Sequence, residues 1–183
     1  SLPPQPGGGE HRYVAPDYVT LVDSPILLGT PAVYEFTVDG KPHYLVNEGE
    51  AGVFDGAMAA KDLQRMVEAQ RAFWGSLPYD RYVFLNVITE AGGGLEHKSS
   101  TTLMTSRWTT RSRGSYVAWL ELASHEFFHA WNVKRLRPVE LGPFDYENEV
   151  HTRSLWMAEG VTDYYGDLMV RRAGLNTREE YLD

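Results

Sequence analysis

The chain has 183 residues, 43% of them hydrophobic, which suits one folded soluble domain or a compact pair of lobes. A formal net charge of −8 argues against nucleic acid as the main partner, and no apolar run approaches the roughly 18 residues of a membrane span. The absence of cysteine excludes disulfide bonds and a cysteine-ligated zinc site, while no targeting segment assigns a compartment.

The two ends of the chain are predicted to differ from its middle. Residues 1–9 are rich in proline and glycine, and we expect residues 1–16 to form a flexible linker. Residues 176–180 have the pattern of a capped helix start, yet the chain ends at Asp183. We therefore expect residues 17–183 to be one domain of a longer protein, truncated at its carboxyl end.

The first half of this domain is predicted to hold the strands. Residues 31–47 alternate between apolar and polar side chains, which predicts a hairpin, and Pro42 is typical of an edge strand. Residues 55–74 have the apolar spacing of a helix, and residues 82–88 are rich in the aromatic and β-branched side chains of a buried strand. A further strand is predicted near residues 101–106. Because strands precede helices, the order favours an α+β fold.

Residues 125–129, His-Glu-Phe-Phe-His, indicate a metal site. On a helix, His125 and His129 project from one face and can bind the same metal ion. Glu126 is displaced around the helix, so it is better placed to touch a metal-bound water than the metal. This spacing is a metalloprotease signature, although a histidine pair also occurs by chance on surface helices. The apolar residues at 116–128 favour a buried, rigid helix, and therefore a specific metal site over a chance histidine pair.

A second segment, residues 154–170, supplies a third metal ligand. Its apolar spacing predicts another buried helix with Glu159 in its first half, and the apolar neighbours of Glu159 disfavour the alternative of a solvated helix glutamate. Because a buried, unpaired carboxylate is costly, we expect a metal ion or a charged partner beside Glu159. Catalytic zinc typically has three protein ligands, so His125, His129 and Glu159 form a set for one zinc ion. Asp163, one turn later, is either the partner of the free ring nitrogen of His125 or an exposed helix aspartate.

Residues 92–97, Gly-Gly-Gly-Leu-Glu-His, are the second informative region. Glycines let another backbone come close, so Gly93 and Gly94 are candidates to receive an extended peptide by strand addition. Glu96 is then placed to pair with the free α-amine of that peptide. The residues alone favour a glycine loop with a surface glutamate, and we interpret His97 as a loop histidine rather than a ligand.

A short basic cluster follows the metal helix. It is too small to bind nucleic acid, and we expect it to pair with the acidic side chains that come next or to position a loop. The basic residues are Lys134, Arg135 and Arg137, and the acidic ones are Asp145, Glu147 and Glu149.

Four motifs, in this order, resemble the glycyl aminopeptidase family of zinc metallopeptidases. They are LVDSPILLG (21–29), GGLEHKSST (93–101), HEFFHAWNVKRLRP (125–138) and LWMAEGVTDYYGDL (155–168). The resemblance implies a thermolysin-like zincin fold, with a small antiparallel β lobe and a helical lobe that carries HExxH and the downstream glutamate. Members of the family carry an N-terminal β-domain and a C-terminal PDZ domain, which we expect to lie outside this chain.

The resemblance also implies roles at the matching positions. It makes His125, His129 and Glu159 the ligands of one zinc ion, and Glu126 the general base and proton shuttle. The GGLEH stretch is similar to the substrate-anchoring motif of the larger zinc aminopeptidases, so Glu96 would hold the N-terminal amine. One departure is the connection between His129 and Glu159, which is longer than in thermolysin or those aminopeptidases.

The sequence therefore predicts a zinc-dependent aminopeptidase that acts on peptide or protein substrates. An endopeptidase is an alternative, since only Glu96 argues for removal of N-terminal residues. A non-catalytic peptide-binding domain with a retained metal site is a second alternative, which the intact Glu126 disfavours because a structural site needs no base. A different zinc hydrolase chemistry on the same scaffold is a third.

Overall fold

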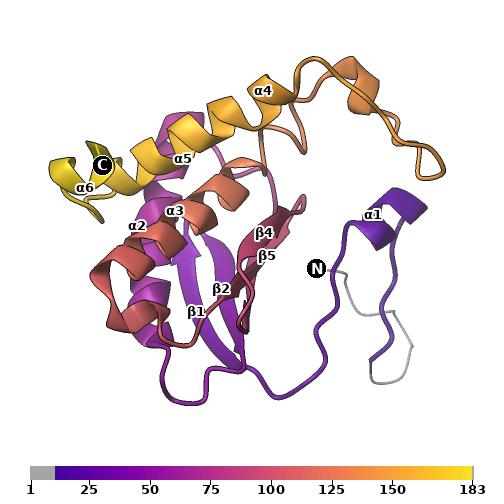
Figure 1. Ribbon diagram of the computed structural model, residues 1–183. Coiled ribbons are helices and arrows are strands. Elements are labelled where there is room, and N and C mark those ends of the chain that lie inside the picture. The colour runs from indigo at the N-terminus through magenta and orange to yellow at the C-terminus, as the bar shows by residue number, and fades with distance from the viewer. Residues whose placement is uncertain (1–10, 183) are drawn as a thin grey trace.

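The computed structural model describes residues 11–182 (Figure 1). Within that range five strands form one sheet in the order β1-β2-β3-β5-β4. The strands are β1 (Ala32–Val38), β2 (Lys41–Glu48), β3 (Tyr82–Ile88), β4 (Gly93–Glu96) and β5 (Ser100–Thr105). The pairs β1–β2 and β4–β5 are antiparallel, whereas β2–β3 and β3–β5 are parallel. The fold is α+β as expected, but its sheet is mixed.

The prediction of an antiparallel sheet is wrong because a helix connects two of the strands. The helix α2 (Gly56–Trp74) lies between β2 and β3 in the chain, so β3 can run parallel to β2. The side chain of Asp55 caps the first turn of α2, and Gly75, in the left-handed conformation, caps its end. Pro42 is also not on an edge strand, since β2 has a neighbour on each side and pairing with β3 starts at His43.

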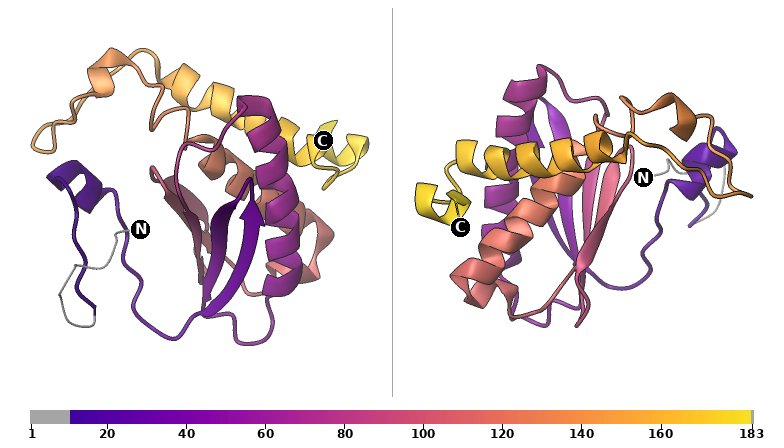
Figure 2. Two further views of the ribbon diagram at one scale, coloured as in Figure 1. Left: turned by 180° about the vertical axis from the view of Figure 1, so that it is seen from behind. Right: turned by 45° about the horizontal axis from the view of Figure 1, so that its top comes forward.

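The described part of the chain holds five helices besides α2. They are α1 (Tyr18–Val22), α3 (Arg113–Phe128), α4 (Leu155–Ala158), α5 (Gly160–Arg172) and α6 (Arg178–Leu182), with short 3-10 turns at Thr109–Arg111 and Val139–Leu141. Of the six, α2, α3 and α5 build two layers on the sheet. The helix α2 packs on β1 and β2, and α3 packs on β5 and β4. Figure 2 shows α5 lying across α3 and α2 as an outer layer.

The core between the sheet and α3 fixes the end of α3. Alternate residues of β3, Tyr82 and Phe84, are fully buried beneath the helices. The ring of Phe127 lies on them, with centroid distances of 4.8 Å to Tyr82 and 5.6 Å to Phe84. Phe127 belongs to the HEFFH sequence, so the packing of its side chain orients the residues on either side of it.

Residues 154–170 do not form the single buried helix that their spacing predicted. The helices α4 and α5 are separated at Glu159. Leu155 and Trp156 are 55% and 71% exposed, so α4 is largely a surface turn. The prediction of a buried Glu159 is therefore wrong, since half of its side chain is exposed. Only α5, through Thr162 and Met169, has a buried face.

The amino-terminal segment lies apart from the helical layers. The helix α1 lies beside the connection that precedes α4 (Figure 1), and the rings of Tyr18 and Tyr146 meet there at 5.5 Å. Of the expected linker at 1–16, residues 1–10 lie outside the described range. Over residues 11–182 no helix combines the length and the apolar character that crossing a bilayer requires.

Candidate metal centre

Three side chains converge where α3 ends. His125 lies in the last turn of α3 and His129 follows its last residue, with their Nε2 atoms 3.1 Å apart. Glu159 Oε2 lies 3.4 Å from Nε2 of His125 and 3.6 Å from Nε2 of His129. Ligand atoms about 2.1 Å from a tetrahedral zinc ion are about 3.4 Å from one another. The three atoms therefore have the separations of a zinc ligand set.

The contacts of the Nδ1 atoms of the two histidines determine that their Nε2 atoms face the candidate metal position. Nδ1 of His129 lies 2.7 Å from the carbonyl oxygen of Asn132. A carbonyl only accepts, so Nδ1 carries the proton and Nε2 keeps its lone pair. Burial lowers the pKa of His129, which favours the neutral ring that metal binding needs. Asp163 Oδ1 lies 3.5 Å from Nδ1 of His125, although the Asp163 side chain is 76% exposed.

A polar link that the sequence did not reveal joins the end of α3 to α4 and α5. The side-chain amide of Asn132 donates to the carbonyl of Met157 and to Thr162 Oγ1, both at 3.0 Å. Thr162 Oγ1 in turn donates to the carbonyl of Ala158 at 2.6 Å. These bonds surround the break at Glu159 and hold it against His129. No local pattern marks an asparagine three residues after the second histidine as important.

Close packing of α5 on α3 positions His125 in a similar way. Ser124 Oγ donates to the carbonyl of Gly166 at 2.6 Å, and Gln70 Nε2 of α2 donates to the carbonyl of Ser124 at 2.8 Å. A Cβ atom on Gly166 would lie 3.0 Å from Cα of His125, so any other residue there would have to push the two backbones slightly apart. The helix that carries His125 and the helix that follows Glu159 are thus in close backbone contact.

Glu126 lies on the sheet side of α3, against β4. It is 6% exposed, and its Oε2 atom accepts no hydrogen bond from the described part of the chain. Burial, followed by the charges of Glu96 and Glu159, raises the pKa of Glu126 to about 8. A Cβ atom on Gly94 would overlap the Glu126 carboxylate. The glycine at 94 therefore makes room for this side chain.

Glu96 is not the surface-loop glutamate that its residue context favoured. It is the last residue of β4. One carboxylate oxygen of Glu96, one of Glu126 and a ring nitrogen of His129 lie within 4.8 Å of one another. Gly93 and Gly94 belong to the same strand, which is the last in the sheet order. The edge of the sheet thus borders the candidate metal centre.

The basic cluster does not pair with the acidic residues that follow it. Lys134 Nζ lies 3.0 Å from Asp23 Oδ1, and Arg135 donates to backbone carbonyls, among them that of Pro78 at 2.6 Å. The Arg137 guanidinium lies over the ring of Phe144 at 4.6 Å. The ion-pair alternative is therefore wrong, because Lys134 pairs with Asp23 and the two guanidinium groups lie on backbone carbonyls and on an aromatic ring.

Comparison with known proteins finds similarity to aminopeptidases. Residues 118–183, which include both histidines, Glu126 and Glu159, match M61 glycyl aminopeptidase. No match was found among curated proteins. The crystal structure of an aminopeptidase N family protein from Idiomarina loihiensis is similar to 99% of this chain, with 32% identity and a TM-score of 0.91.

This chain covers 32% of that protein, so it spans about a third of its length. The fold similarity extends over both the sheet and the helices, while the family match covers the segment with the converging side chains. Both comparisons are to aminopeptidases, as the motifs in the sequence are. They support the assignment of the chain to the M61 glycyl aminopeptidase family.

Proposed function

We propose that the chain is the catalytic domain of a zinc-dependent peptidase, with His125, His129 and Glu159 holding one zinc ion. The observation that carries this proposal is the convergence of three ligand atoms at 3.1 to 3.6 Å from two separate segments. The donor set of two imidazoles and one carboxylate, without thiolate, is one that catalytic zinc uses.

The residues around this centre suit hydrolysis of a peptide bond. Bound zinc supplies Lewis acidity, which polarises a carbonyl and lowers the pKa of water. Glu126 would take the proton of the attacking water and later deliver it to the departing amine. Its burial against Gly94 and its free Oε2 atom support this assignment, because the carboxylate is held beside the ligands without a competing donor.

We further propose that peptides are held by their amino terminus. A peptide that pairs with the edge of β4 would pass the centre in an extended conformation. Glu96, at the end of that strand and only 22% exposed in its side chain, would then receive the ammonium group. Such an anchor limits cleavage to N-terminal residues and makes the enzyme an aminopeptidase.

The domain organisation follows from the same reasoning. Residues 17–183 would form a thermolysin-like catalytic domain, in which the sheet supplies the substrate edge and the helices supply the ligands. The match to a third of a longer relative supports the presence of further domains in the whole protein, such as the N-terminal β-domain and PDZ domain that the resemblance implies. Those domains would contribute to substrate selection.

The metal and base roles are tested with Glu126→Gln and His129→Ala. We expect Glu126→Gln to keep about one zinc per chain by atomic absorption and to lose at least a hundredfold in peptide hydrolysis, since general-base catalysis contributes about that much. His129→Ala should lose the metal. Glu68→Gln, an exposed change on α2, is the matched control. Hydrolysis that survives in Glu126→Gln would contradict the base assignment.

Amine anchoring is tested with a peptide and its N-acetylated form. We expect cleavage of the free peptide to be favoured at least tenfold, because acetylation removes a charge-assisted bond to Glu96. Glu96→Gln should reduce this preference, while Glu35→Gln on the opposite edge strand should leave it intact. Equal cleavage of both peptides by the unchanged protein would instead indicate an endopeptidase.

A further inference from the structure

We propose that Asp23 is a positioning residue that holds the Lys134 ammonium away from Glu96, so that Glu96 stays open to the ammonium group of a substrate. This inference rests on the proposed anchoring of substrates by Glu96. It assigns a role to the first of the four sequence motifs, LVDSPILLG, which supplies none of the residues proposed above for metal binding or hydrolysis.

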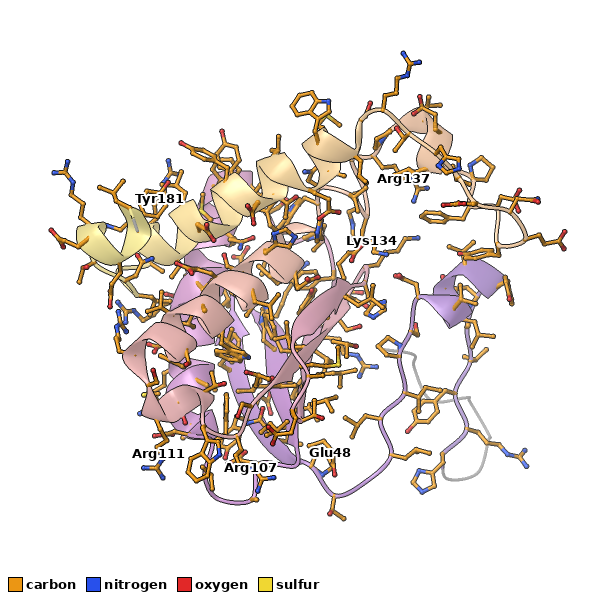
Figure 3. The ribbon with its side chains drawn as sticks, in the orientation of Figure 1. Glu48, Arg107, Arg111, Lys134, Arg137 and Tyr181 are labelled. Carbon is orange, nitrogen blue, oxygen red and sulfur yellow. The ribbon has the colours of Figure 1, made fainter. Side chains whose placement is uncertain are left out.

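Lys134 is a single cation between two carboxylates. Its Nζ atom lies 3.0 Å from Asp23 Oδ1 but 3.9 Å from Glu96 Oε1, so only the bond to Asp23 has hydrogen-bond length. The side chains of Asp23 and Lys134 are each 15% exposed, and water screens their attraction only in part. In Figure 3, Lys134 extends from the loop after α3 past the end of β4 towards the segment of α1.

Asp23 is itself held in place by the turn that follows Glu96. Its Oδ2 atom accepts from the backbone N–H of Lys98 at 2.8 Å, and its Oδ1 atom lies 3.3 Å from Nδ1 of His97. Burial alone would raise the pKa of Asp23, but these hydrogen bonds and the charge of Lys134 lower it to about 2. The carboxylate is therefore ionised and fixed beside Lys134.

The charges explain what Asp23 would achieve. Without its negative charge, the nearest carboxylate to Lys134 would be Glu96, and a direct ion pair would occupy the oxygens proposed to bind substrate. A substrate ammonium would also be repelled by an unneutralised Lys134. Asp23 removes both effects, because it takes the hydrogen bond of Lys134 and balances its charge.

A purely structural role for Asp23 makes a different prediction. In that case its bonds to Lys134, His97 and Lys98 only tie α1 to the core, and removing Lys134 as well would weaken the protein further. The positioning role predicts that removing Lys134 as well restores substrate binding, because Lys134 is the group that pairs with Glu96 once Asp23 is changed. A double variant therefore separates the two roles.

The experiment measures peptide binding without turnover. In a Glu126→Gln background, isothermal titration calorimetry gives the Kd of the tripeptide amide Gly-Leu-Tyr-NH2 and of its N-acetylated form. We expect Asp23→Asn to weaken binding of the free peptide about tenfold and to leave the acetylated form unchanged. Lys134→Met should strengthen binding of the free peptide, and Asp23→Asn/Lys134→Met should bring it back to the parent value or better.

Several outcomes would overturn the proposal. Equal weakening of both peptides by Asp23→Asn is one, and a double variant as weak as Asp23→Asn is another. Asp39→Asn, which removes a surface pair with Arg71 at 3.0 Å, is the matched control. If Asp23→Asn fails to fold, Lys134→Met decides, since weaker binding of the free peptide in that variant contradicts the proposal.

A separate variant tests the underlying function. If Glu96→Gln leaves the preference for the free peptide intact, amine anchoring at Glu96 is wrong whatever the Asp23 variants do. If Glu96→Gln removes the preference and the double variant is not rescued, anchoring stands and only the role of Asp23 is wrong.

Discussion

At the scale of single residues, the candidate centre depends on position 94 being a glycine. Gly94 has no Cβ, and the Glu126 carboxylate occupies the space where one would lie. Neither residue reveals this relation in the sequence, because 31 positions separate them and only the packing of α3 on β4 brings them together. By contrast, the pairing of His125 with His129 follows from helix geometry and was predictable.

This contact gives a prediction for Gly94→Ala. The added methyl group must displace Glu126, so we expect peptide hydrolysis to fall at least tenfold, a modest part of what general-base catalysis contributes. Zinc content, measured on the same sample, should stay near one per chain because the three ligands are untouched. Gly92→Ala is the control, since its Cβ would meet open space. Equal activity of the two variants would show that Glu126 has room to move.

At the scale of elements, the centre needs α3 to stay registered against α4 and α5. We expect Asn132→Ala to lower the free energy of unfolding by about 1–3 kcal/mol, because it removes the donor to Thr162 Oγ1 and to the carbonyl of Met157. Zinc affinity in a chelator competition should fall about 10- to 100-fold, as for other residues that orient ligands. Asn148→Ala in the exposed connection is the control. Unchanged affinity would show that the packing at Gly166 suffices.

The elements themselves were predicted better than their arrangement. The hairpin at 31–47, the helix at 55–74 and the strand at 82–88 follow from local periodicity, and the structure contains all three. The parallel pairing of β3 with β2 and β5 could not be read in this way, since it depends on where distant segments meet. The break at Glu159 was also missed, because apolar spacing continues through it while the packing does not.

At the scale of the whole molecule, one buried histidine makes stability depend on pH. His43 is fully buried, with Nδ1 2.9 Å from the Lys41 carbonyl and Nε2 3.0 Å from the Tyr79 hydroxyl. Burial lowers the pKa of His43 to about 4, so protonation favours the unfolded chain, where the pKa is about 6.5. Its contribution is complete above pH 6.5 and is lost as the pH falls to about 4.

We therefore expect the free energy of unfolding to fall between pH 6.5 and 4 by an amount on the order of 3 kcal/mol. Urea titrations of the metal-free protein at several pH values measure this loss, and His43→Gln should reduce it. Both proteins should carry Glu126→Gln, because the raised pKa of Glu126 acts with the opposite sign in this range. Burial also lowers the pKa of His129, but this residue contributes equally to both proteins. Equal slopes in the two proteins would assign the effect to groups other than His43.

The largely exposed segment at 139–151, between His129 and Glu159, has a consequence for how such centres evolve. Glu159 is placed by contacts of Asn132, just after α3, and of Gly166 on α5, and not by the length of this segment. Doubling the length of a flexible loop costs only about 0.6 kcal/mol in closure entropy. We therefore expect insertions and deletions there to be tolerated, so that relatives with the same candidate ligands need share no fixed distance in sequence between the second and the third.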